Sequence, residues 1–231
     1  MIKRAWILLL ILFAIVGYSG VVDAKLIKIG MATISGGTGA GGAGMPGQSG
    51  NSSEYNLIYE DNQGLIWLDY SNLGNRWPQQ MNWAAGLNVP GVLTYKFDPG
   101  ISVSWEGEWR LPKTIDGARR FGYDGTTTVG FNITTSELGH LFYVSLENRG
   151  YYDTKGTPGT GWFPDSDWGP KNTGPFENLQ AGMYWSCTEY SIYPQHAWAF
   201  NFAFGHQGNK SFKSSYPYLG IAVRPGTVSG R

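Results

Sequence analysis

Cys187 is the single cysteine of the chain and lies in the stretch YWSCTEY, with His196 nine residues further on. A thiol beside an imidazole is the nucleophile and base pair that cysteine-dependent enzymes use. In a strand, however, Cys187 shares its face with Trp185, a large ring expected in the core. We therefore predict a structural thiol, more than about four-fifths buried and without a histidine within hydrogen-bonding reach.

Two acidic residues, Glu106 and Glu108 in the stretch WEGEWRLP, have the residue types of a glycosidase carboxylate pair. If this stretch is a strand, both carboxylates share the solvent face with Arg110, while Trp105 and Trp109 point inward. That alternation is typical of an ordinary amphipathic strand. We therefore expect no catalytic carboxylate pair here.

Metal binding is the next candidate chemistry, because Asp165 and Asp167 alternate in a loop. An EF-hand loop would need glycine where Pro170 stands and glutamate where Phe176 stands, so that type of calcium site is excluded. A loop-built calcium site that also uses Asp153 stays open as an alternative. Three histidines and one cysteine are too widely spread to suggest a zinc site. We expect no cofactor.

The N-terminus has the pattern of an export signal. Lys3 and Arg4 precede an uncharged run over 5–22, and a small-residue cleavage site ends at Ala24. We predict a signal peptide over 1–24 and a secreted or cell-surface protein; if the segment stays uncleaved, it would serve as a membrane anchor. The net charge of the chain is zero, which does not favour nucleic-acid binding.

The composition predicts one loop-rich domain after a flexible leader. Residues 25–55 are rich in glycine and are expected to form that leader, 56–226 the folded domain and 227–231 a tail. Aromatic residues make up 15% of the chain and charged residues another 15%, so large rings must fill the core. No disulfide within the chain can stabilise the fold, since only one cysteine is present.

Several β-strands can be placed from the pattern of apolar and turn residues. The stretch over 57–68 reads as two strands around an Asp-Asn-Gln-Gly turn, and a short helix follows Pro78 and ends at Gly86. Residues 197–204 alternate between large rings and smaller side chains, which predicts a strand. A last strand is expected over 219–225, ending at its proline.

A second helix is predicted over Ser136–Arg149. A capping box over 134–137 would begin it, and Gly150 would stand just past its end. We expect its apolar stripe to pack on the sheet that contains Trp185 and Trp198. The stripe consists of Leu138, Leu141, Phe142 and Leu146. Two helices with short antiparallel strands and long loops make an α+β domain.

Four ordered stretches resemble one known family. They are GLIWLDY over 64–70, WRLPK over 109–113, YWSCTEY over 184–190 and AVRPG over 222–226. Together they are similar to the Lcl C-terminal domain family, bacterial exported domains formerly of unknown function and named for a collagen-like adhesin. The resemblance covers about residues 56–226.

The resemblance implies a C-type-lectin-like fold, binding of glycans or host surfaces, and homotrimer formation, but no known reaction. Similar members frequently have serine at the position of Cys187, which argues against a catalytic thiolate. We therefore expect a non-catalytic, lectin-like module that binds an extracellular glycan in the manner of an adhesin. A structural assembly protein is one alternative. An enzyme like the formylglycine-generating oxidases is another, although their paired active-site cysteines are absent.

Recognition residues usually collect in loops on a rigid scaffold, and aromatic faces with nearby amides and cations suit sugar rings and their substituents. The expected cations for acidic or sulfated sugars are Lys210 and Lys213, which lie on or beside the turns that connect the last strands. The candidate ligand-binding residues are Trp162, Trp168, Tyr193, His196, His206, Gln207, Asn209, Lys210 and Lys213.

Overall fold

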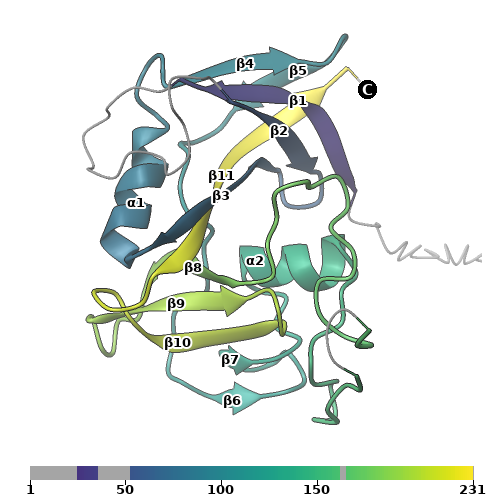
Figure 1. Ribbon diagram of the computed structural model, residues 1–231, viewed down its shortest axis with the longest axis vertical. Coiled ribbons are helices and arrows are strands. Elements are labelled where there is room, and N and C mark those ends of the chain that lie inside the picture. Colours follow the sequence, from purple (N-terminus) through teal and green to yellow (C-terminus); the bar gives the residue numbers. More distant parts are fainter. Residues whose placement is uncertain (1–24, 36–52, 162–164, 231) are drawn as a thin grey trace, which may run out of the picture.

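The computed structural model describes residues 25–35, 53–161 and 165–230. The expected signal peptide over 1–24 and the glycine-rich stretch over 36–52 lie outside these residues. The chain forms two lobes, which β3 (Leu65–Asn75) and β11 (Tyr218–Ser229) connect (Figure 1). The domain is α+β, as the sequence predicts, because strands dominate and two short helices accompany them.

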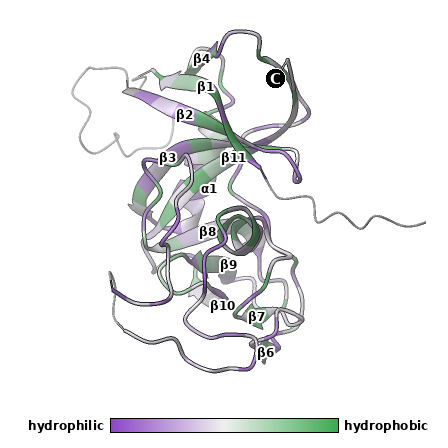
Figure 2. Cartoon of the chain, turned by 90° about the vertical axis from the view of Figure 1, so that its right-hand side faces the viewer, coloured by the Kyte–Doolittle hydropathy of each residue, from purple (hydrophilic) through white to green (hydrophobic). Residues whose placement is uncertain are grey.

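The first lobe is a strongly curved sheet with an aromatic interior. Its strands follow the order β4-β1-β2-β3-β11, and β5 pairs with the far end of β11. Hydrophobic residues line its inner side, and hydrophobic and hydrophilic stretches alternate along its strands (Figure 2). The remaining strands of this lobe are β1 (Leu26–Ile34), β2 (Ser53–Glu60), β4 (Leu93–Phe97) and β5 (Ser102–Trp105).

The expected hairpin over 57–68 is confirmed. β2 and β3 pair antiparallel, with Leu57 opposite Leu68 and Glu60 opposite Leu65. Gly64 closes the connection with φ of 61°, a left-handed conformation that favours glycine. The apolar β-formers on both sides of polar turn residues therefore determine this pairing.

The folded region is longer at both ends than the sequence indicates. Leu26–Ile34 lies in the expected leader but forms β1, which pairs with β2 and β4. At the other end, β11 continues through Pro225 to Ser229, although its proline was expected to end it. Pro225 is the last residue paired with β3, and Gly226 begins the pairing with β5. The missing N–H therefore falls where the strand changes partners.

The second lobe carries the sheet order β8-β9-β10-β7-β6. Leu219 of β11 joins it to the first lobe through a parallel pairing with Tyr184 of β8, and β6 pairs parallel with β7. The sheet is therefore mixed and not purely antiparallel as expected. Its strands are β6 (Phe121–Gly122), β7 (Val129–Gly130), β8 (Met183–Glu189), β9 (His196–Asn201) and β10 (His206–Phe212).

One helix covers each face of β8 and β9. α1 (Trp77–Gly86) begins beside Pro78 and ends at Gly86, as predicted, and packs with Trp185 and the alanines of β9. α2 (Glu137–His140) packs on the opposite face with Tyr184 and the phenylalanines that follow in and after β9. The alternation over 197–204 therefore separates two cores, as a strand buried on both faces requires.

The second predicted helix is real but much shorter than expected. Ser136 is its N-cap and accepts a hydrogen bond from Gly139 N, so the capping box over 134–137 is wrong. A π-helical turn, Leu141–Ser145, follows α2, and Glu147 at φ of 52° redirects the chain before Gly150. The apolar stripe is buried as expected, but it packs on the Tyr184 face of the sheet, whereas Trp185 and Trp198 belong to other clusters.

Candidate functional site

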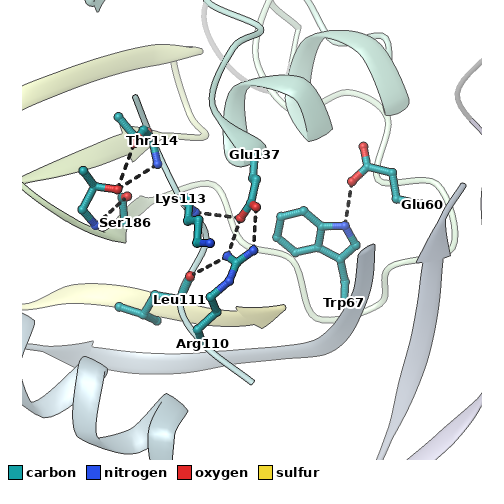
Figure 3. A network of polar contacts seen from close by, with 9 residues as sticks. Glu60, Trp67, Arg110, Leu111, Lys113, Thr114, Glu137 and Ser186 are labelled. Atoms are coloured by element: carbon teal, nitrogen blue, oxygen red, sulfur yellow. Dashed lines mark hydrogen bonds and ion pairs between the residues drawn. The ribbon is translucent and has the colours of Figure 1, made fainter. Parts of the chain in front are cut away.

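The residues that carry the family resemblance mostly hold the two lobes together. Figure 3 shows Arg110, from the segment after β5, directed at Glu137 at the start of α2. The guanidinium donates two hydrogen bonds of 2.7 Å to this carboxylate, and the backbone N–H of Lys113 donates a third, also 2.7 Å long. A bidentate, half-buried pair of this kind fixes orientation. The WRLPK stretch is therefore structural.

The YWSCTEY stretch of β8 is structural for the same reason. Trp185 Nε1 donates to the carbonyl of Asn75 at 3.0 Å, and Cys187 N donates to the carbonyl of Pro112 at 2.8 Å. Thr188 Oγ1 donates to the carbonyl of Thr114 at 3.0 Å. These bonds connect β8 to the end of β3 and to the segment after β5, so most of this stretch serves packing and strand contacts.

Cys187 has the surroundings of an unreactive thiol, although it is partly buried and not fully enclosed. It packs beside Leu111 and Trp185. Burial raises the pKa of this thiol, an effect that nearby Arg110 opposes. Within the described part of the chain, no hydrogen bond joins it to a histidine. A raised pKa reduces the thiolate fraction that a nucleophile needs.

A buried carboxylate, Glu60, lies in a network that resembles a catalytic triad only in its residue types. Its Oε1 lies 2.8 Å from His140 Nδ1 and accepts from Ser145 Oγ, and its Oε2 accepts from Trp67 Nε1 at 2.8 Å (Figure 3 shows the Trp67 bond). In a triad the serine would contact Nε2 of the histidine. Here Nε2 faces the amide of Asn62 at 3.3 Å. The network therefore ties β2 to α2 and leaves no activated hydroxyl.

The most suitable binding site is an open pocket in the second lobe, formed by the β8–β9 loop and the middle of β10. Its volume of about 560 Å³ lies in the range of small-ligand sites, roughly 300–1,000 Å³. The lining residues are Arg119, Tyr190, Ile192, Tyr193, Gln195, His196 and Asn209.

The β8–β9 loop keeps a fixed shape through its backbone. Tyr193 N donates to Tyr190 O at 3.1 Å, and His196 N donates to Tyr193 O at 2.8 Å. Tyr190 itself packs in a buried cluster with Trp198, whose Nε1 donates to Asp116 Oδ1 at 2.8 Å. One wall of the pocket is therefore held in place before any ligand arrives, which lowers the entropic cost of binding.

A β-bulge brings Asn209 to the pocket. Gly208 pairs with Ala199 and Ser211 with Ala197, so two residues of β10 oppose Trp198 alone. Such an insertion re-aims a side chain and leaves it outside the ladder, and bulges are frequent beside functional sites. A regular β10 would have no such extra residue at the pocket.

Asn209 is the most informative residue of the site. Its side chain is 1% exposed, and neither Nδ2 nor Oδ1 has a hydrogen-bond partner among the described residues. A buried amide without partners costs about 1–3 kcal/mol for each unsatisfied group. Such a group needs a partner from outside the chain, either a bound ligand or an ordered water. The amide offers both a donor and an acceptor to the pocket.

The other pocket residues complement this amide. Tyr193 is 55% exposed and presents an aromatic face. His196 is half-buried, and its Nδ1 also has no partner within the described residues. Arg119 is exposed and forms no ion pair with a described carboxylate. The site thus combines a ring, two unsatisfied polar groups and a cation.

The other expected site residues lie away from this pocket. Gln207 is buried and donates from Nε2 to the carbonyl of Thr128 at 2.9 Å. His206 packs with the rings of Phe121 and Phe131, and burial lowers the pKa of its imidazole. Trp168 is buried and stacks on Phe204 at 5.1 Å between ring centroids. All three are occupied by internal contacts.

Of the two lysines expected to bind an anionic ligand, Lys210 and Lys213, only Lys213 has a described side chain, and it contacts other residues of the protein. Lys213 forms an ion pair with Glu189, and its Nζ lies 4.6 Å from the ring centroid of Trp77. Lys213 is therefore engaged inside the protein and is not a free cation for an anionic ligand. The side chain of Lys210 and all of Trp162 lie outside what the structure describes.

The aspartates considered for calcium organise their own loop. Asp153 Oδ1 accepts from the backbone N–H groups of Lys155 at 2.9 Å and Thr157 at 2.8 Å. Asp167 pairs with Arg149 at 2.7 Å. Across the described residues, no group of three or more metal-ligating side chains is found.

A second, smaller pocket of about 260 Å³ lies beside the loop after α1 and includes Glu108 and Arg224. Its asparagine, Asn88, is already satisfied, since it donates to and accepts from the backbone of Trp109 at 2.9 and 2.8 Å. Arg224 lies over the ring of Trp105, 4.3 Å from its centroid. These internal contacts make this pocket the weaker candidate.

Sequence reasoning found three pocket residues, Tyr193, His196 and Asn209, and missed the other four, of which Arg119 is the least obvious. The β8–β9 turn itself signals Gln195 and Ile192, but nothing in the sequence brings Arg119, 90 positions before Asn209, to the same place.

No helix in the described parts of the chain is long and apolar enough to span a bilayer. Comparisons with protein-family models, curated proteins and solved structures found no match.

Proposed function

We propose that this protein is a secreted or cell-surface, non-catalytic, lectin-like module that binds an extracellular glycan in the pocket of Asn209 and Tyr193. The observation that carries the proposal is the buried, unpartnered amide of Asn209 at an open pocket. This amide has a donor and an acceptor but no hydrogen-bond partner. The hydroxyl groups of a sugar can both donate and accept, so they can supply the missing partners. The resemblance to the Lcl C-terminal domain family, with its C-type-lectin-like fold, supports the same function.

The arrangement of the other pocket groups also supports a sugar ligand. The exposed face of Tyr193 provides an apolar surface for the C–H face of a pyranose ring, and Gln195 and His196 add polar groups around it. Arg119 provides one charge that can meet a carboxylate or sulfate substituent. Lys213 is engaged elsewhere, so among the described pocket residues Arg119 is the cation that can favour acidic sugars.

Two observations favour binding over catalysis. The pKa of Cys187 is raised by burial, and no histidine of the described residues forms a hydrogen bond with its thiol. Glu106 and Glu108 are exposed and line neither a shared cleft nor the pocket of Asn209.

A glycan array followed by titration tests the proposal. We expect the purified protein to bind a subset of glycans, and Tyr193→Ala to weaken that binding by more than about tenfold, which corresponds to about 1.4 kcal/mol. Phe204→Ala is the control, because Phe204 is 38% exposed but lies in the turn after β9, away from the pocket. Equal losses in both variants, or no binding to any glycan, would refute the proposal and favour an assembly role.

A further inference from the structure

Two pocket residues, His196 and Asn209, lie on neighbouring strands, β9 and β10. Gln207 lies opposite Phe200, and Phe212 lies opposite His196. Directly opposite residues of an antiparallel pair share a face, so Phe212 stands on the same face as His196. The bulge at 209–210 lets Asn209 share this face too, since the alternation resumes at Ser211.

Three aromatic rings on this side of the second lobe form a row that begins in the pocket and ends on the surface next to it. The ring of Tyr193 lies 6.2 Å from that of His196, and the ring of His196 lies 4.1 Å from that of Phe212. Tyr193 and His196 line the pocket, whereas Phe212 lies beyond its wall. Phe212 is 44% exposed, so much of its ring contacts solvent.

A ligand confined to the pocket would leave Phe212 unused. Tyr193 and Phe212 each offer an exposed apolar ring face, and the pocket beside them contains two unpartnered polar groups, the Nδ1 of His196 and the amide of Asn209. Aromatic faces beside hydrogen-bonding groups match a chain of sugar units, each of which has an apolar ring face and polar edges. An apolar protein segment would leave the amide of Asn209 unsatisfied.

We infer that the ligand is an extended polysaccharide, which occupies the pocket with one end and continues across His196 onto Phe212. This inference rests on the proposed function and assigns it a substrate class, a chain of several linked sugar units. Phe212 then serves as a separate subsite that only longer chains reach. Its contribution adds to that of the pocket as a second, linked contact.

The test uses ladders of β-1,4-linked glucose, N-acetylglucosamine and hexuronate-containing oligosaccharides, from two to six units. For the ladder that binds, we expect the affinity of the wild-type protein to rise more than about tenfold from the shortest to the longest member, which is about 1.4 kcal/mol. Phe212→Ala should remove this rise and leave the affinity for the disaccharide unchanged. Phe204→Ala, which removes an exposed ring in the turn after β9, should preserve the rise.

The outcomes separate the two proposals. If disaccharides bind, and Tyr193→Ala abolishes the binding, but affinity does not depend on chain length, the proposed function stands and the polysaccharide inference is wrong. The inference is also wrong if Phe212→Ala weakens every member equally. If no ladder binds, the polysaccharide inference is wrong, whereas the proposed function fails only if the glycan array also shows no binding; binding of an apolar peptide to Phe212 would then identify this face as a protein interface. Thermal midpoints of all variants verify folding.

Discussion

Replacing Asn209 by leucine should stabilise the free protein and abolish ligand binding. The side chain is 1% exposed, and its two polar atoms have no partner among the described residues. Each unsatisfied group costs about 1–3 kcal/mol, and leucine has the same branching pattern without polar atoms. Its larger size will offset part of the gain through strain, typically about 1–3 kcal/mol when a core is overpacked. We therefore expect the free energy of unfolding to rise by about 1–3 kcal/mol.

Asn148→Leu is the matched control. Asn148 is also buried, but its Nδ2 donates to Asn172 O and its Oδ1 accepts from Asn172 N, both at 2.8 Å. The same substitution there removes two satisfied hydrogen bonds and leaves the backbone groups of Asn172 without these partners. We expect a loss of about 1–3 kcal/mol. The two variants should thus shift stability in opposite directions.

Urea unfolding, followed by fluorescence of the buried tryptophans, measures both variants. The midpoint should rise for Asn209→Leu and fall for Asn148→Leu, with the slope of each transition unchanged. If both variants lose similar stability, the amide of Asn209 is used within the folded protein and is not reserved for a ligand. Retained glycan binding by Asn209→Leu would refute the reasoning in the same way.

Three further predictions follow from the core and the titratable groups. Leu141→Ala should lower the free energy of unfolding by about 2–5 kcal/mol in a urea titration, because Leu141 is fully buried between α2 and the sheet; an unchanged midpoint would contradict this packing. Burial lowers the pKa of His206 from 6.5, so the unfolded chain gains its proton first and stability should fall as pH drops below 6.5. His206→Phe should reduce this loss of stability at low pH. Identical pH dependence of stability in the variant and the wild-type protein would refute the role given to His206. Cys187→Ser should keep fold and glycan binding with a small loss of stability, whereas a folded variant without binding would give the thiol a functional role.

Short-range patterns of the sequence predict the local elements well. The hairpin over 57–68 and α1 depend on turn residues, Pro78 and Gly86, all of which act within a few positions. The second helix was predicted too long because its apolar spacing continues past Ser145, where the chain leaves the helix after a π-helical turn. Periodicity cannot distinguish a buried helix from a buried irregular segment.

The pairing of strands that are far apart in the chain could not be predicted from the sequence. Nothing local shows that β11 changes partners at Pro225, since the reason lies in β3 and β5. The candidate site has the same limit, because the bulge that brings Asn209 to the pocket is a mismatch between two strands. The strand alternation shows which residues share a face, but not which loop supplies Arg119 to it. Site residues that depend on such pairings can be found only in the folded chain.

The side-chain amide of Asn209 offers the most direct test of the glycan site. Its NH₂ signals can be followed by NMR in the ¹⁵N-labelled protein while a glycan selected on the array is added. Ligand contact should shift these signals in a saturable way and slow their exchange with solvent, while the NH₂ signals of Asn148, already bonded to Asn172, stay in place. A glycan that binds to saturation and leaves the Asn209 amide unchanged would contradict the proposed site.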